Sequence, residues 1–266
     1  GNPGVVPQNM PGGGGAKMGA YLAEVAAKDG TNIGMMANNF PAMQAAGVDL
    51  IRFDLGKFNW IGSISPTVET MTVWKSAGIN TIDEAKTKEI IAGATGKGAI
   101  TYTFPGMLNE FLGTKFKIVS GYPGGNDINL AMERGEVQAR NNTWSSWKVT
   151  KPEWLKNGDI KVLVYAGPRQ PDLKDVPIAS RRIVDLITSG TKLGRPLATN
   201  GGVPADRVAA LRDAFDKTMQ DPDFLKEAAQ SRVDVDPVRG VDMQKVVADV
   251  LATPKPLAER AKSLIE

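Results

Sequence analysis

The stretch at residues 113–140 constrains the fold most, because strand, turn and helix signals follow one another there in a fixed order. Residues 116–119 are rich in strand-forming side chains, and a glycine-bearing turn at residues 122–125 comes shortly after them. Apolar residues then recur at helical spacing until Gly135, and a second strand is predicted at residues 136–139. The turn places backbone N–H groups at a helix N-terminus, where an anion can bind. Most such turns need glycine only to change direction, so both interpretations remain open.

Strand and helix patterns alternate along the rest of the chain in the same way. The predicted strands include residues 31–36, 68–74, 90–94, 160–166 and 193–198. Two more glycine-bearing turns precede predicted helices, at residues 12–15 and 95–98. This alternation predicts an α/β fold with largely parallel sheets.

The glycine run at residues 12–15 is not a phosphate-binding P-loop. That motif requires Gly-Lys-Ser/Thr, whereas Ala16, Lys17 and Met18 follow the run here. The run also contains no GxGxxG pattern in either register. What it offers is a flexible loop of backbone N–H groups before a helix, which can hold a carboxylate as readily as a phosphate.

Composition narrows the possible functions. With 266 residues, 42% of them hydrophobic, the chain can bury the core of one large or two small domains. The net charge of +3 is scattered, and no basic run alternates with aromatic residues, so a nucleic-acid partner is not expected. No apolar run reaches the length of a membrane span, and no signal peptide is recognisable.

The chain has no histidine and no cysteine, which excludes the commonest catalytic and zinc-binding arrangements. Its 29 acidic residues stand singly in turns and on helix faces, without the spacing of a general acid and base. A binding protein is therefore favoured over an enzyme, and no catalytic residue, metal or cofactor is expected. An enzyme or a ligand sensor acting on an anionic metabolite remains the alternative.

Several motifs, taken in order, resemble the substrate-binding (receptor) proteins of tripartite tricarboxylate transporters, which are Bug-type periplasmic solute-binding proteins. The unit at residues 113–140 carries part of this resemblance, through Tyr-x-Gly-Gly and Glu-Arg-Gly-Glu-Val. The other matching segments are residues 8–15, 27–31, 171–177, 202–208 and 221–224. The resemblance spans nearly the whole chain.

The resemblance implies a two-lobed periplasmic-binding-protein-like fold of type II, with a ligand cleft between the lobes. Each lobe is expected to be a mostly parallel sheet flanked by helices. Residues 1–76 and 190–266 would form the first lobe, and residues 77–189 the second. Members of the family carry a further strand, helix and glycine-rich loop before the part that resembles residues 5–15, and the first lobe is expected to lack them here.

By the same resemblance, the protein captures a small organic acid, a carboxylate or dicarboxylate, closes around it at a hinge, and delivers it to the permease subunits of a tripartite transporter. The chain would be the mature form of a periplasmic protein, with no direct membrane insertion. No acidic residue is present in residues 140–142 to pair with an ammonium group, so amino acids are not the expected ligands.

The expected ligand residues come from turns and strand ends that should face the cleft. They are Gly13, Gly14, Gly15, Ala16, Asn38, Asn39, Thr95, Gly96, Lys97, Gly98, Tyr122, Asn141, Asn142 and Arg195. Three kinds of residue among them also have plainer interpretations. Lys97 is more typical of a solvated surface than of a ligand contact. The asparagine pair at 38–39 is equally typical of an ordinary turn, and Arg195 of a contact that ties the two lobes together.

Overall fold

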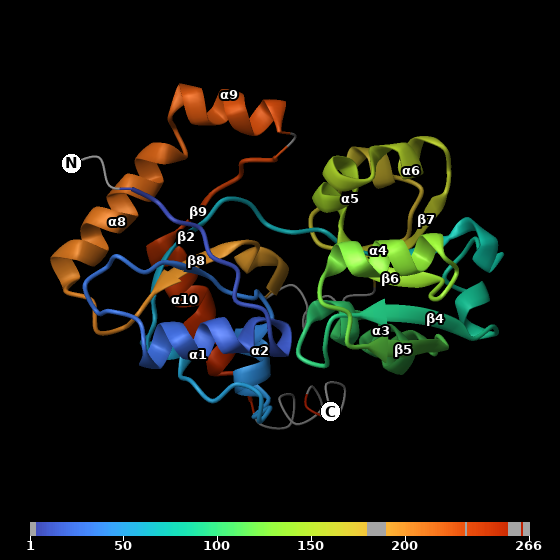
Figure 1. Ribbon diagram of the computed structural model, residues 1–266, viewed down its shortest axis with the longest axis horizontal. Coiled ribbons are helices and arrows are strands. Elements are labelled where there is room, and N and C mark those ends of the chain that lie inside the picture. The colour runs from blue at the N-terminus through green and yellow to red at the C-terminus, as the bar shows by residue number, and fades with distance from the viewer. Residues whose placement is uncertain (1–3, 180–189, 232, 255–261, 263–266) are drawn as a thin grey trace.

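The computed structural model describes residues 4–179, 190–231, 233–254 and 262. They form two α/β lobes that lie side by side, each built on its own sheet (Figure 1). The α/β, two-sheet class predicted from the sequence is confirmed. None of the helices in the described part of the chain is long and apolar enough to cross a membrane.

The first lobe combines the beginning and the end of the described chain. Its sheet has the strand order β1-β8-β2-β9. Its elements are η1 (Gly13–Gly15), α1 (Ala16–Glu24), β1 (Gly34–Met35), α2 (Phe40–Ala45), η2 (Leu55–Lys57), β2 (Asn59–Ser63), β8 (Pro196–Thr199), α8 (Ala205–Thr218), α9 (Pro222–Gln230), β9 (Val238–Arg239) and α10 (Gly240–Leu251). Phe40, Met43 and Trp60 are buried in its core, where α10 packs against β2.

The second lobe contains the middle of the chain and the sheet β5-β4-β6-β3-β7. Its elements are β3 (Glu69–Trp74), η3 (Lys75–Ala77), η4 (Glu84–Lys86), β4 (Ile90–Ala94), α3 (Ile100–Leu112), β5 (Phe116–Ser120), α4 (Gly125–Glu133), β6 (Ala139–Thr143), α5 (Trp144–Thr150), α6 (Pro152–Lys156), β7 (Ile160–Ala166) and η5 (Pro171–Leu173). Phe104 and Leu108 of α3 fill the core on one face, and three tryptophans, Trp144, Trp147 and Trp154, pack on another.

The sheets are less parallel than the sequence predicts. β4 is parallel to β5 and β6, but β3 is antiparallel to both of its neighbours, β6 and β7. In the first lobe, β8 is antiparallel to β1 and β2, and β2 is antiparallel to β9. The reason is topological: β3 and β8 each follow a crossing from the other lobe and insert between two strands that run the opposite way.

Two more expectations are corrected. The boundary expected at residue 76 placed β3 in the first lobe, whereas β3 pairs in the second sheet, so the chain crosses between Ser63 and Glu69. The strand predicted at residues 136–139 begins only at Ala139, because Gly135 and the N–H of Glu136 are used to close α4.

Candidate functional site at the lobe interface

Two of the predicted glycine turns, one from each lobe, are in direct contact. Gly14 has a positive φ of 63° and packs so closely that an added Cβ would lie 2.8 Å from the backbone nitrogen of Ala99. The same Cβ would lie 2.9 Å from the carbonyl carbon of Gly98. Only glycine allows both this backbone conformation and this approach.

An asparagine side chain fastens the two turns together. The Nδ2 of Asn39, at the start of α2, donates to the Gly98 carbonyl oxygen at 3.0 Å. Its neighbour Asn38 donates to the hydroxyl of Thr67, in the segment that crosses to the second lobe, at 3.2 Å. We call the contact formed by residues 12–15, Asn38, Asn39 and residues 96–99 the seam.

A cavity of about 460 Å³ opens beside the seam and is lined from both lobes. We call it the seam cavity. It is lined by Gly13, Met43, Val48, Asp49, Leu50, Arg52, Lys97 and Gly98. The combination of apolar walls with two cationic side chains and one carboxylate suits a small anion with a short hydrocarbon chain. Arg52 was not expected at the site, and its position in the loop after α2 gives no sequence signal.

The predicted backbone donors are only partly available for a ligand. The N–H of Gly15 bonds to the Gly12 oxygen, and the N–H of Ala16 bonds to the Gly13 oxygen. In the second lobe, the N–H of Thr95 is taken by the Thr101 hydroxyl at 3.1 Å. These short loops bend back on themselves and satisfy part of their own N–H groups, which the expectation of open donors did not consider.

A buried carboxylate that sequence reasoning missed lies behind the seam. Glu69, the first residue of β3, is 1% exposed, and its Oε2 accepts from the Nδ2 of Asn141 at 3.0 Å. Burial raises the pKa of Glu69, and hydrogen bonding by Asn141, Thr67 and Asn38 opposes this shift. A signal was present in the sequence: strand alternation places Glu69 on the same face as the core residues Met71 and Val73.

Arg140 is a second buried charge that holds the adjacent elements in place. Its guanidinium donates to the Gly125 carbonyl oxygen and, at 2.7 Å, to the Oδ1 of Asn129, and it stacks 5.3 Å from the Trp147 ring centre. Burial lowers the pKa of Arg140 to about 10, so it stays charged at neutral pH. It thereby fixes the start of α4, and with it the predicted turn at residues 122–125, against β6.

The predicted pair Asn141 and Asn142 divides between the two faces of the sheet. The register places Asn141 opposite Met71 and Asn142 opposite Thr70, so their side chains point in opposite directions. Asn141 therefore faces Glu69, while Asn142 lies on the face of Arg140. The Oδ1 of Asn141 and the Nδ2 of Asn142 are both buried without a hydrogen-bond partner within the described part of the chain. Unpartnered buried amides of this kind suit a bound polar group.

Tyr122 and Arg195 make other contacts and are not among the residues that form the seam. Tyr122 packs against the cluster that contains Ile128 and Val137, and burial raises the pKa of its hydroxyl. Arg195 donates from Nη2 to the Ser145 hydroxyl of the second lobe at 3.2 Å. This hydrogen bond is a contact between the two lobes, which was one of the two interpretations of Arg195.

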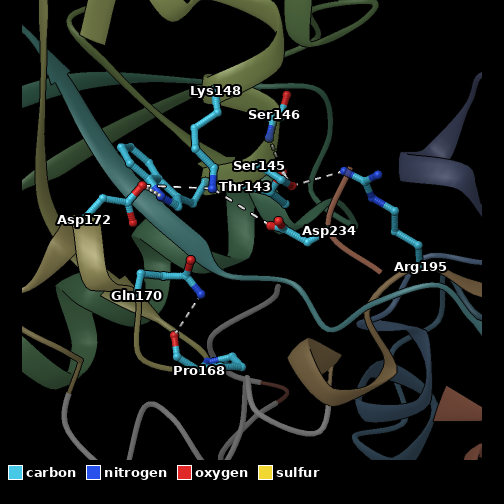
Figure 2. A network of polar contacts seen from close by, with 10 residues as sticks. Thr143, Ser145, Ser146, Lys148, Pro168, Gln170, Asp172, Arg195 and Asp234 are labelled. Atoms are coloured by element: carbon cyan, nitrogen blue, oxygen red, sulfur yellow. Dashed lines mark hydrogen bonds and ion pairs between the residues drawn. The ribbon is translucent and has the colours of Figure 1, made fainter. Parts of the chain in front are cut away.

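Ser145 belongs to a groove at the lobe interface, and Arg195 points toward it from the first lobe (Figure 2). The groove has a volume of about 450 Å³. Its polar residues include Ser145, Lys148, Gln170, Asp172, Asp234 and Asp236. Lys148 lies between two carboxylates, with its Nζ 4.0 Å from Asp172 and 3.9 Å from Asp234. We call this region the charged groove; unlike the seam, it is held by long side chains.

Comparisons with known proteins agree with this architecture. No family model and no curated protein sequence matches the chain. Among solved structures, the periplasmic binding protein BugD aligns with a TM-score of 0.74 and 19% identity, over 97% of this chain and 85% of its own. MatC from Rhodopseudomonas palustris with bound malate aligns with a TM-score of 0.70 and 19% identity, over 96% of this chain and 85% of its own. An R. palustris protein with adipate aligns with a TM-score of 0.71 and 17% identity, over 94% of this chain and 84% of its own. The chain therefore has the two-lobed fold of periplasmic binding proteins of type II.

Proposed function

We propose that this chain is a solute-binding protein that captures a small dicarboxylate between its lobes. The observation that carries the proposal is the seam cavity, which both lobes line and where Arg52 and Lys97 stand beside the two glycine turns. A guanidinium and an ammonium group supply charge-assisted hydrogen bonds to carboxylates. Two proteins of similar fold, solved with malate and with adipate, support an acid with two carboxylate groups.

Two of the expected site residues, Gly14 and Asn39, fit a closing mechanism. Gly14 and Asn39 join the lobes directly across the cleft, so rotation at the two crossing segments would open and close the cavity. A ligand that bridges Arg52 of one lobe and Lys97 of the other would favour the closed form, because it gains contacts only there. The unpartnered amide atoms of Asn141 and Asn142, on opposite faces of β6, remain candidates for contact with a bound polar group.

Binding is proposed in place of catalysis. The sequence has no histidine or cysteine, and the described residues contain no cluster of acidic side chains suited to a metal ion. We further propose that the protein works outside the cytoplasm and passes its acid to the membrane subunits of a tripartite transporter. The periplasmic location of BugD and the sequence motifs described above support this assignment.

Thermal unfolding and calorimetry with succinate, malate, adipate and glucose test the proposal. A ligand at 100 times its Kd stabilises the folded state by about 2.7 kcal/mol, so at least one diacid should raise the melting temperature while glucose should not. Arg52→Met should weaken diacid binding at least about tenfold, which corresponds to about 1.4 kcal/mol.

Arg134→Met is the matched control, because Arg134 is an exposed arginine on the far end of α4. It should leave the affinity unchanged. A stabilising shift with glucose alone, or equal diacid affinity in Arg52→Met and the unchanged protein, would contradict the proposed site.

A further inference from the structure

The two segments that join the lobes are packed against each other. Residues 64–68 cross from the first lobe to the second, and the N–H of Thr67 bonds to the Thr191 oxygen of the returning segment at 3.0 Å. Gly194 in the returning segment has a positive φ of 61°, and an added Cβ there would overlap the carbonyl oxygen of Ser65. Because the two segments are in contact at both points, we expect them to act as one pivot about which the lobes rotate.

The seam and the charged groove lie on opposite sides of this pivot. The Thr67 hydroxyl accepts a hydrogen bond from Asn38 of the seam, whereas the neighbouring residues Pro66 and Val68 line the charged groove. In Figure 1, α2 and α3 lie on one side of the joining segments, and α5 and α9 lie on the other. A rotation that brings the lobes together at the seam therefore moves them apart at the charged groove.

The two sides of the pivot are filled to different degrees. At the seam, Gly14 leaves no room for a Cβ between the lobes. The charged groove is also lined from both lobes, by Gln170 of the second and Asp236 of the first among others, but it keeps a volume of about 450 Å³. The structure is thus closed at the seam and open at the charged groove, as expected for the form that encloses a ligand in the seam cavity.

The charged groove can influence this rotation more through its volume than through its charges. Its ion pairs are weak because they are partly exposed, as with Lys148 and an Asp234 side chain that is 68% exposed (Figure 2). A bulky side chain in the groove would instead collide with the opposite lobe whenever the groove closed, and such overlap is costly. It would therefore oppose the rotation that opens the seam.

We propose that the charged groove and the seam are coupled through the pivot, so that filling the groove raises the affinity of the seam cavity for its acid. This inference rests on the proposed function, because it concerns the regulation of the same site. The apparent affinity of a ligand is reduced by the fraction of free protein that is not in the binding-competent form. Raising the closed fraction therefore strengthens binding without any new contact to the ligand.

Two substitutions fill the groove, one from each lobe. Gln170→Trp replaces an amide that donates to the Pro168 oxygen of its own loop at 3.5 Å, and Asp236→Trp adds bulk from the first lobe. The probe is whichever of succinate, malate and adipate the unchanged protein binds most tightly. Calorimetry should find this acid at least threefold tighter in both variants. Gln220→Trp, at an exposed position just after α8 and outside the groove, is the control and should leave the affinity unchanged.

A distance measured without ligand tests the coupling separately from binding. The chain has no cysteine, so spin labels can be attached at Glu24→Cys on α1 and Glu110→Cys on α3. Both positions are exposed, and both helices lie on the seam side of the pivot (Figure 1). In the ligand-free protein, the distance between the labels should shift to shorter values in both groove variants and stay the same in Gln220→Trp.

A longer or unchanged distance in the two groove variants would overturn the inference, because filling the groove would then not close the seam. A shorter distance without tighter binding would also overturn it, because closure would not govern the affinity. If none of the three diacids binds the unchanged protein, the proposed function fails instead, and the label distances still decide whether the groove and the seam are coupled.

Discussion

The two lobes meet in two regions that are built from different interactions. At the seam, backbone atoms and short amide side chains approach within 3.0 Å, and Gly14 leaves no room for another atom. In the charged groove, the lobes are joined by long side chains, with the Lys148 amine 3.9 Å from an Asp234 carboxylate that is 68% exposed. Contacts of the first kind depend on shape, whereas contacts of the second kind are screened by salt and cost side-chain entropy. We infer that the seam controls closure and that the charged groove adjusts it weakly.

The largest expected effect comes from filling the seam. Gly14→Ala would place a Cβ 2.8 Å from the Ala99 nitrogen, so the lobes could not close fully. Diacid affinity should fall by at least about tenfold, the equivalent of about 1.4 kcal/mol, as measured by calorimetry. Small-angle scattering with saturating diacid should find the variant more extended than the unchanged protein.

Gly47→Ala is a close control for this experiment. Gly47 has a φ of 67°, against 63° for Gly14, but nothing lies within 4 Å of an added Cβ there. Both variants should lose about 1–2 kcal/mol of stability from the left-handed backbone, and only Gly14→Ala should lose binding. An equal loss of binding in the two variants would show that backbone strain, and not contact between the lobes, is responsible.

The next prediction concerns the pH dependence of stability. It distinguishes the buried carboxylate of Glu69, next to the seam, from the exposed charged side chains of the charged groove. Burial raises the pKa of Glu69 above its ordinary value of 4.5. The folded protein therefore binds this proton more tightly than the unfolded chain does. The resulting stability is fully present below about pH 4.5 and is lost as the pH rises through the folded-state pKa.

Urea unfolding of the unchanged protein and of Glu69→Gln, from pH 5 to pH 8, measures this contribution as a difference. The unchanged protein should lose stability relative to the variant as the pH rises, by no more than about 1.4 kcal/mol per pH unit for one group. High salt should leave the difference nearly unchanged, because the carboxylate is buried. Parallel pH profiles for the two proteins would show that the pKa of Glu69 is not raised.

Local sequence signals predicted most of the fold. The β-strands at Ile90–Ala94 and Ile160–Ala166 lie where the apolar runs predict them, and Gly113 and Gly135 close helices at positive φ. Strand direction was wrong, because the antiparallel insertion of β3 and β8 depends on two crossings between lobes. No sequence pattern within a single strand predicts which sheet that strand will join.

The site was less predictable than the fold, and the reason is distance in sequence. Glycine turns can be recognised from the local sequence, so Gly14 and Gly98 were expected at the interface. The two turns are in contact. Glu69 lies 72 residues from Asn141, and only the pairing of β3 with β6 brings them together. Arg52 joins Lys97 at one cavity by the packing of two lobes, which no spacing in the chain predicts.

The smallest expected effect comes from the charged groove. Lys148→Met removes the ion pairs with Asp172 and Asp234, whose side chains are 48% and 68% exposed. Exposed pairs of this kind contribute about 0.2–1 kcal/mol, so diacid affinity should change by no more than about fivefold at low salt. The change should disappear at about 1 M salt, where the screening length falls to about 3 Å. Lys217→Met, which breaks an exposed pair within α8, should not change the affinity at either salt concentration. If Lys148→Met weakened binding more than Gly14→Ala does, and the loss persisted at high salt, closure would be controlled from the charged groove, and the roles assigned to the two regions would be reversed.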